Sequence, residues 1–213
     1  TMPETITRIG VSAFQGTAVS KWNTLPALKE YADSAFAYNT GFTAITLSSN
    51  IEKFGTGVFK GCPNLTSINV QTSSAILSAT GGVLYDKSGT KLMQFPAAKA
   101  VNGDYAVPAN VVEIGEDAFL MAKNITSLTL PVGITAIGEN AFRGCAKLDS
   151  VTVEWHTPLD VPANIFEGVD VANAVLAVPK TTDELYKNAN VWKEFGRLSI
   201  YLDDVATIDF EDE

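Results

Sequence analysis

The segment Phe54 to Cys62, FGTGVFKGC, carries three glycines and a lysine within nine positions. That composition could make a loop whose backbone N–H groups bind phosphate. A phosphate loop of the nucleotide-binding type needs a strand before it, a helix after it and Gly-Lys-Ser/Thr in that order. The order here is Lys60-Gly61-Cys62. The segment therefore does not fit a nucleotide site, and its glycines need another explanation.

Few residues remain for nucleophilic, acid–base or metal chemistry. The chain has two cysteines, Cys62 and Cys145, and one histidine, His156. Any histidine-based triad or zinc site would have to be built around His156 alone. The sequence also lacks a Gly-x-Ser-x-Gly motif, a second zinc-binding histidine and a Walker motif. We therefore expect a protein that is not an enzyme and that has no cofactor and no catalytic or metal site.

Acidic residues outnumber basic ones, 24 to 15, which gives a formal net charge of −9. This charge repels phosphate backbones and anionic membrane surfaces, so we expect no nucleic-acid partner. No run approaches the roughly 18 apolar residues that a membrane span requires, so no span is expected in this chain. Asp203-Asp204 and Glu211-Asp212-Glu213 could hold calcium weakly, but a solvated acidic tail explains them better.

The glycines of the opening segment belong to an internal repeat. Ile134–Val153 aligns without a gap on Ile51–Val70 and shares with it two glycines, a phenylalanine, a cysteine and a leucine. A third copy, Val111–Leu130, has Met121-Ala122 in place of the Gly-Cys pair. Weaker copies are found at Ile6–Gly16, Leu28–Leu47 and around Val161–Val169.

Phenylalanines mark the period of the repeat. By residue number, Phe14, Phe36 and Phe59 are 22 and 23 positions apart, and Phe119, Phe142 and Phe166 are 23 and 24 apart. The 60 positions between Phe59 and Phe119 predict one degenerate repeat that carries an insertion. A period of about 20–29 residues with one short strand per unit is typical of a leucine-rich-repeat solenoid, here of roughly seven units.

The shared pattern is Ile-Gly-x-x-Ala-Phe-x-Gly-Cys-x-x-Leu-x-x-Ile/Val-x-Val/Leu, and it resembles the BspA-like leucine-rich repeat family over about residues 4–178. Two further segments resemble parts of that family. GGVLYDKSGTKLMQFP is similar to a hairpin that such proteins insert between repeats, and VPKTTDELYKNANVWKEF is similar to their helical C-terminal end. The opening TMPETITRIG enters directly at a repeat, which predicts a chain truncated from a longer protein.

We predict an α/β fold, a single leucine-rich-repeat domain over residues 1–213. The last six residues of each copy alternate between apolar and polar, so they should form a concave parallel β-sheet with the apolar residues inward. The Ala-Phe half of each copy should form short convex helical turns whose phenylalanine fills the core. The two cysteines occupy the same position of the repeat three layers apart, so they should lie roughly 14 Å from each other. Because a disulfide needs Cα atoms within about 7 Å, no intrachain disulfide is expected.

A β-hairpin insertion is predicted at about 81–96, packed on the solenoid or projecting from it, with a turn from Asp86 to Gly89. A C-terminal helical cap is predicted at about 179–202, in which Thr182 caps the helix. Its apolar face should cover the last repeat, as open solenoid ends require. That face consists of Leu185, Ala189, Trp192 and Phe195.

The outward positions of the predicted sheet form the candidate binding surface. They are small, polar and uncharged, which suits a flat contact, although serine and threonine are also ordinary solvent-facing strand residues. Trp155 and His156 lie where a strand leaves the sheet, and Trp155 could stack on a sugar, anchor a protein contact or pack beneath the loop. The positions are Ala44, Thr46, Ser67, Asn69, Ser127, Thr129, Ser150 and Thr152, with Glu154, Trp155 and His156 at an edge.

The resemblance implies a noncatalytic protein–protein interaction or adhesion module of a bacterial cell-surface or secreted protein. It also implies an extracellular or cell-surface location, with the targeting segment absent from this chain, and a protein or glycan ligand, which a host could supply. Two alternatives stay open. The chain could be a glycan-binding module that depends on Trp155, or a passive structural spacer that displays another domain.

Overall fold

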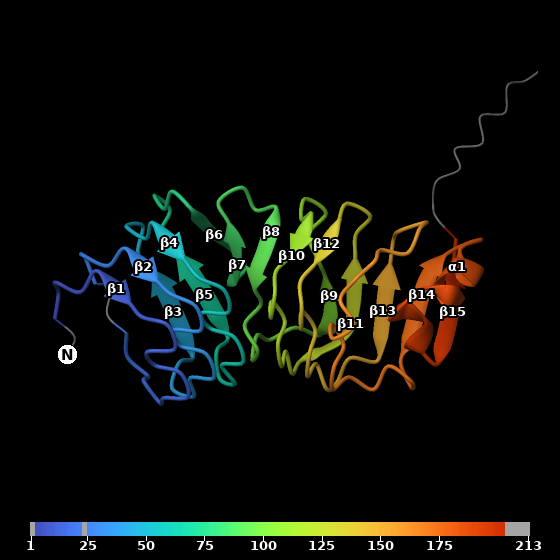
Figure 1. Cartoon of the computed structure of the whole chain (residues 1–213), viewed down its shortest axis with the longest axis horizontal. Coiled ribbons are helices and arrows are strands. Elements are labelled where there is room, and N and C mark those ends of the chain that lie inside the picture. The colour runs from blue at the N-terminus through green and yellow to red at the C-terminus, as the bar shows by residue number, and fades with distance from the viewer. Residues whose placement is uncertain (1–2, 23–24, 203–213) are drawn as a thin grey trace, which may run out of the picture.

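The computed structural model describes residues 3–22 and 25–202 and shows a solenoid of stacked coils (Figure 1). Asp203-Asp204 and Glu211-Asp212-Glu213, for which calcium was considered, lie outside the described residues. Each regular coil passes through a short strand on one side of the solenoid and a longer strand on another side. We call these two sides the short-strand face and the long-strand face.

Parallel pairing between successive coils builds both faces. The sheets of the long-strand face have the orders β3-β5 and β9-β11-β13-β14-β15, and those of the short-strand face contain β1-β2-β4 and β8-β10-β12. The long strands are β3 (Ala44–Leu47), β5 (Ser67–Val70), β9 (Gly103–Ala106), β11 (Ile125–Leu130), β13 (Ser150–Val153), β14 (Val175–Pro179) and β15 (Arg197–Tyr201). The short strands are β1 (Arg8–Ile9), β2 (Glu30–Tyr31), β4 (Lys53–Phe54), β10 (Glu113–Ile114) and β12 (Ala136–Ile137).

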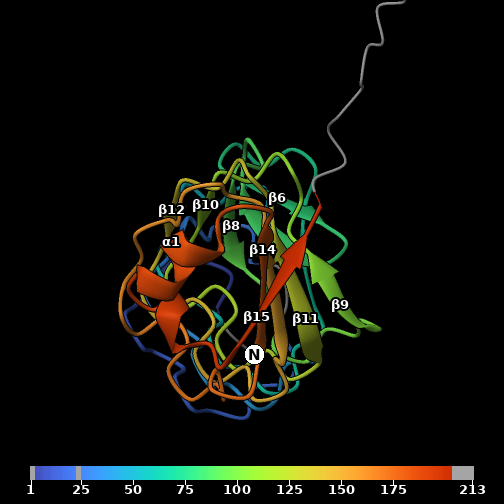
Figure 2. The same ribbon diagram turned by 90° about the vertical axis from the view of Figure 1, so that its right-hand side faces the viewer.

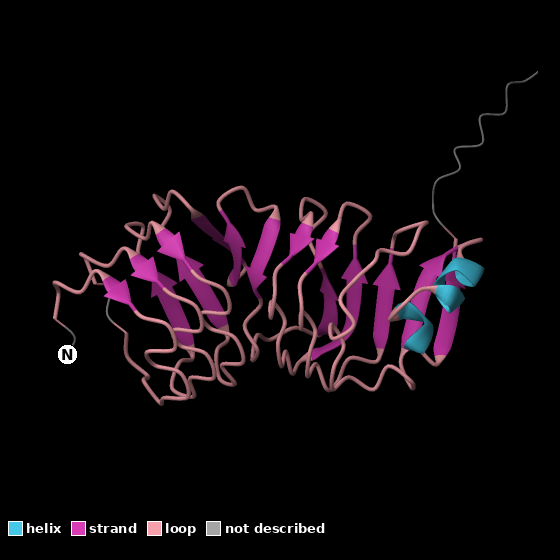
Figure 3. Ribbon diagram, in the orientation of Figure 1, coloured by secondary structure: helices cyan, strands magenta, loops and turns pink. Residues whose placement is uncertain are grey.

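The predicted short helical turns are wrong. The Ala-Phe segments are turns without helix, and helix occurs in the described residues only near the C-terminal end (Figure 3). In the first coil the N–H groups of Ser12, Phe14 and Gly16 donate to carbonyl oxygens of the next coil. A helix would instead direct each N–H to the carbonyl four residues earlier in the same chain. These segments thus hold neighbouring coils together, while the N–H groups of the intervening residues Ala13 and Gln15 donate to carbonyl oxygens three residues earlier.

In these segments only every second N–H group donates to the next coil, and residues in the left-handed backbone conformation make this alternation possible. The second residue after the phenylalanine has a positive φ in six coils, and it is glycine in four of them. Tyr38 and Met121 take the same conformation, at φ 57° and 59°, without the freedom of glycine. The slot that holds Met121 in the third copy therefore keeps its backbone shape when the Gly-Cys pair is lost.

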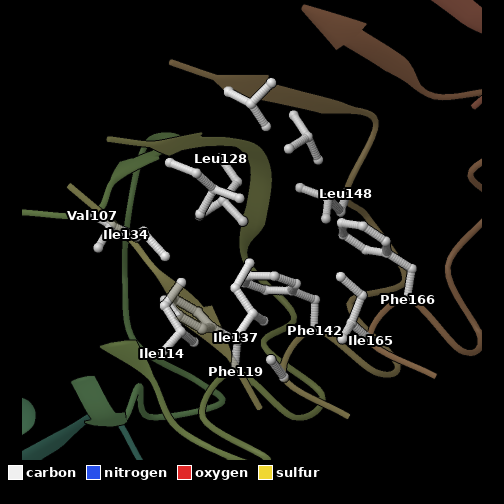
Figure 4. Close-up of a cluster of buried hydrophobic side chains, with 14 of the residues drawn as sticks. Val107, Ile114, Phe119, Leu128, Ile134, Ile137, Phe142, Leu148, Ile165 and Phe166 are labelled. Carbon is white, nitrogen blue, oxygen red and sulfur yellow. The ribbon is translucent and has the colours of Figure 1, made fainter. Parts of the chain in front are cut away.

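The phenylalanines stack in two ladders, one of Phe14, Phe36 and Phe59 and one that runs from Phe95 to Phe166. Figure 4 shows Phe119, Phe142 and Phe166 of the second ladder. Phe119 is fully buried, with ring centroids 5.0 Å from Phe95 and 5.4 Å from Phe142. Phe142 in turn lies 5.3 Å from Phe166. Phe95 is thus the phenylalanine of the degenerate repeat, and seven coils within the described residues each contribute one such ring.

The predicted hairpin is confirmed between β7 (Val83–Asp86) and β8 (Lys91–Gln94), which pair antiparallel. It carries a third strand that was not predicted, β6 (Leu77–Thr80), which pairs antiparallel with β7. Because β8 also pairs in parallel with β10, the insertion is part of a solenoid sheet. It does not project from the solenoid.

Strand β7 separates two hydrophobic cores. Val83 and Tyr85 pack into the core that contains Phe119, whereas Leu84 packs into the core that contains Phe36 and Phe59. All three side chains are buried, because alternate residues of a strand point to opposite sides and both sides of β7 meet a core. The interior of the solenoid is therefore divided at the insertion.

The C-terminal end is less helical than predicted. The helix α1 spans only Asp183–Asn188, and a 3-10 helix η1 (Trp192–Glu194) follows it. Leu185, predicted to be buried, is 51% exposed, and Tyr186 is buried in its place. The Thr182 hydroxyl donates to the Pro179 carbonyl and does not cap the helix. Seen end-on, α1 lies across the core from β14 and β15 (Figure 2). The helices are thus one side of a final coil that β15 completes.

Candidate functional site

The long-strand face places most of the predicted surface residues in ordered rows. Parallel pairing aligns Ser127 with Ser150 and Thr129 with Thr152. The rows continue onto strands whose outward residues were not among the predicted positions. The first row is Asp104, Ser127, Ser150, Val175 and Arg197, and the second is Ala106, Thr129, Thr152, Ala177 and Ser199.

The middle of this face is uncharged and has unused hydrogen-bonding groups. Within residues 3–22 and 25–202, the hydroxyls of Ser127, Thr129, Ser150 and Thr152 make no hydrogen bond, and none of them is sealed from solvent. Hydroxyls elsewhere are often used internally, and Thr135 Oγ1, for example, donates to the Val112 carbonyl at 3.2 Å. The four hydroxyls are therefore available to a partner that lies flat on the sheet.

The predicted residues do not form one continuous surface. On the other side of the insertion, Ala44 aligns with Ser67 and Thr46 with Asn69 in the two-stranded sheet β3-β5. The tip of the insertion lies beside this sheet, since the Ile68 N–H donates to the Gly82 carbonyl at 2.9 Å. The structure thus brings together the four central hydroxyls and leaves this second group in a separate sheet.

The three edge residues have different environments. Trp155 is only 6% exposed and lies 5.8 Å from Trp192, ring centroid to centroid, so it packs beneath the loop and offers no ring face for a sugar. Its indole Nε1 has no hydrogen-bond partner in the described structure. Glu154 Oε2 accepts from the Val132 N–H at 3.1 Å, and His156 is exposed.

Both cysteines are buried and free. Cys62 Sγ donates to the Phe36 carbonyl at 3.1 Å, and Cys145 Sγ donates to the Phe119 carbonyl at 3.2 Å. Burial raises the pKa of each thiol to about 12 because a thiolate would lose its hydration in the core. Both residues stay protonated at neutral pH, so they act as core residues and not as nucleophiles.

The described residues offer neither a metal centre nor a membrane span. In the part of the chain that the structure places, no three His, Cys, Asp or Glu side chains gather closely enough to hold a metal ion. No helix there has the length and apolar character needed to cross a bilayer.

The sequence of residues 1–81 and 103–189 matches the BspA type leucine rich repeat region in six copies. The chain belongs to this family. The unmatched residues between the two BspA-type segments include β7 and β8, so the insertion is also what interrupts the family pattern. A search of curated proteins gave no significant match.

Solved bacterial proteins are similar to this chain in fold at low sequence identity, and this likeness concerns the fold alone. A leucine rich cell surface protein from Faecalibacterium prausnitzii matches over 93% of this chain and 58% of its own, at 18% identity and a TM-score of 0.68. A leucine-rich repeat protein from Eubacterium ventriosum matches over 84% and 59%, at 19% identity and a TM-score of 0.62. The pneumococcal vaccine antigen PcpA matches over 96% and 67%, at 16% identity and a TM-score of 0.60. The chain thus spans less than two thirds of the first two proteins.

Proposed function

We propose that this chain is a noncatalytic protein-binding module of a bacterial cell-surface or secreted protein, with the long-strand face as its recognition surface. The observation that carries the proposal is the set of four unused hydroxyls, Ser127, Thr129, Ser150 and Thr152, aligned on the two central strands of that face. The centre of a protein interface is depleted of charged residues, and this region has none.

The family and the structural neighbours support the location and the class of function. The F. prausnitzii neighbour is described as a cell surface protein, and PcpA as a vaccine antigen. An exposed location would give a solenoid of this kind access to proteins of other cells or of a host. A glycan ligand loses its main support because Trp155 is buried.

The test is a label-free binding screen of the purified chain against extracellular-matrix proteins and mucin glycans. The double variant Thr129→Arg/Ser150→Arg places two long cations in the middle of the uncharged rows. The matched control, Val112→Arg/Ala136→Arg, adds the same charge at exposed positions on the short-strand face.

We expect a protein ligand whose binding falls at least tenfold in the long-strand variant and is unchanged in the control, with equal melting temperatures for all three proteins. Equal binding by the long-strand variant would remove this face as the recognition surface. Absence of any ligand for the folded chain would favour the passive spacer instead.

A further inference from the structure

The coil that carries the insertion is two residues shorter than its neighbours on the short-strand face. Ile114, at the end of β10, precedes Phe119 by five residues, and Ile137 precedes Phe142 by the same number. Leu92 pairs with Ile114 in the parallel ladder, yet it precedes Phe95 by only three residues. The turn that joins the short strand to the phenylalanine is therefore missing from this coil.

A cleft of about 500 Å³ lies where the missing turn would be. One wall is the turn of the preceding coil, Gly55 to Val58, and the other is formed by Gly115 and Glu116 of the following coil, with Gly138 and Glu139 beyond them. Ile76, Leu77 and Met93 of the insertion add apolar surface. The volume falls within the roughly 300–1,000 Å³ that is typical of ligand sites.

The missing turn leaves backbone groups without partners on both walls. In neighbouring coils three N–H groups donate to the next coil, as Ser34, Phe36 and Tyr38 do at 2.8–3.0 Å. The equivalent N–H groups in the following coil belong to Gly57, Phe59 and Gly61. None has a hydrogen-bond partner within the described chain, and that of Gly57 lies in the wall of the cleft. Buried or half-buried N–H groups are rarely left in this state.

The opposite wall carries the complementary acceptors. The carbonyl oxygens of Glu139 and Arg143 accept from the coil before them, at 3.0 and 2.8 Å. Their equivalents in the coil that faces the cleft, Glu116 O and Leu120 O, accept nothing from any described residue, and Glu116 lies in the wall of the cleft. An unpaired donor on one wall, Gly57 N–H, and an unpaired acceptor on the other, Glu116 O, are what an inserted peptide backbone would satisfy.

The side chain of Gln94 offers the cleft a further hydrogen-bonding group. It is 4% exposed and lines the cleft, and its Nε2 donates to the carbonyls of Phe95 and Ala118 at 3.3 and 3.2 Å. Its Oε1 has no hydrogen-bond partner among the described residues. This oxygen is accessible to solvent, because Trp155 Nε1 is the only fully buried side-chain polar atom without a partner in that part of the chain. A buried amide oxygen therefore opens into the cleft as a further acceptor.

The cleft has a negative potential. Four carboxylates line it, those of Asp86, Glu113, Glu116 and Glu139, against one ammonium group, that of Lys91, which pairs with Glu113 at 2.5 Å. Burial alone would raise the pKa of Asp86, but hydrogen bonds from the Ser88 hydroxyl and the Lys91 N–H lower it overall. Asp86 is therefore ionised at neutral pH, and the lining favours cations.

We propose that this cleft binds a short, extended, cationic peptide segment whose backbone makes the hydrogen bonds of the missing turn. The apolar residues of the insertion would contact its alternate side chains, and the carboxylates would pair with its lysine or arginine residues. This site belongs to the short-strand side of the solenoid and is independent of the long-strand face proposed above.

The test is an array of immobilised hexapeptides in which Lys or Arg alternates with Val, Leu or Tyr, probed with the labelled full chain. The same array with Glu in place of the cations controls for charge. For the best binder, a version N-methylated on alternate backbone nitrogens controls for the hydrogen bonds. We expect saturable binding of cationic members, and at least tenfold weaker binding of the Glu and N-methylated versions.

Two variants locate the binding on the protein. Glu116→Lys/Glu139→Lys reverses two exposed charges of the cleft, and Glu4→Lys/Asp160→Lys makes the same net change at exposed positions elsewhere. We expect at least tenfold weaker binding only in the first. Replacement of Met93-Gln94 by Gly-Glu-Asn-Ala, the sequence of Gly138–Ala141, should restore the turn, raise the melting temperature and abolish peptide binding.

The proposal is overturned if no cationic member of the array binds the folded chain, or if the N-methylated peptide binds as well as its parent. It is also overturned if the two charge variants lose affinity equally, because binding would then reflect the overall acidity of the protein. If the four-residue replacement prevents folding, the charge variants alone decide the outcome.

Discussion

Truncation of Phe119 tests whether the ladder of phenylalanine rings holds the coils together. Phe119 is fully buried and contacts Phe95 on one side and Phe142 on the other. Removing such a core ring costs about 3–5 kcal/mol, which is a large part of the ~5–15 kcal/mol that stabilises a typical protein. We therefore expect Phe119→Ala to lower the free energy of unfolding by about 4 kcal/mol.

Phe14 provides the matched comparison, because it begins the other ladder and is only partly buried. Its ring lies 5.1 Å from Phe36 and has no earlier phenylalanine beneath it. We expect Phe14→Ala to cost less than half as much as Phe119→Ala, since a partly exposed ring has less area to lose from the core.

Urea unfolding followed by tryptophan fluorescence would measure both variants. Trp155 and Trp192 belong to the core of Phe119, whereas Trp22 packs against the core of Phe14. A loss below about 1.5 kcal/mol for Phe119→Ala, or equal losses for the two variants, would refute the view that the stacked rings carry the stability.

Three further predictions concern single sites. Gly61→Ala should lower the free energy of unfolding by about 1–2 kcal/mol, because Gly61 has φ +62° and a Cβ there would meet the Tyr38 ring at 2.5 Å. The control Gly10→Ala, with open space around it, should be nearly neutral by thermal melting. Lys60→Met should cost about 1–3 kcal/mol at pH 7 by urea unfolding, because it removes the 2.8 Å partner of the buried Asp117 carboxylate; an unchanged midpoint would contradict this. The two thiols have a pKa of about 12 in the folded chain and about 9.0 when unfolded, so the unfolded chain loses these protons first as the pH rises. The free energy of unfolding should therefore fall above pH 9, by about 1.4 kcal/mol per thiol at pH 10. Cys62→Ala/Cys145→Ala should flatten that decline when unfolding is measured as a function of pH.

The sequence predicted the features that repeat. The period of the phenylalanines and the alternation at the end of each copy depend on many similar residues, so the solenoid, the parallel long strands and the hairpin turn from Asp86 to Gly89 could all be found. The four central hydroxyls could be placed on one face because their positions follow directly from the strand period.

Features that depend on contacts between coils could not be predicted in this way. The Ala-Phe segments have residues compatible with a helix, but every second N–H group bonds to the next coil, which no local pattern reveals. Similarly, α1 ends at Asn188, so the expected apolar face does not lie on one helix, and Tyr186 is buried while Leu185 is exposed. Trp155 is buried because Trp192, 37 positions later, packs on it.

The cleft was missed for a different reason. Its signal is a shortening, the three residues from Leu92 to Phe95 where other coils have five. That shortening is visible only after Leu92 and Phe95 have been assigned to the degenerate coil. Alignment of the copies by their short strands, and not only by their phenylalanines, would have shown it.

Strand β7 has a mechanical consequence for a protein that is held at both ends. Since Leu84 belongs to one core and Val83 and Tyr85 to the other, the loss of packing on one side of β7 leaves the other side largely intact. Under a pulling force we expect the chain to lengthen in two separate steps, each the rupture of one core. The insertion would then act as a boundary between two unfolding units, so that one half of the solenoid can unfold while the other half stays folded and keeps its surface.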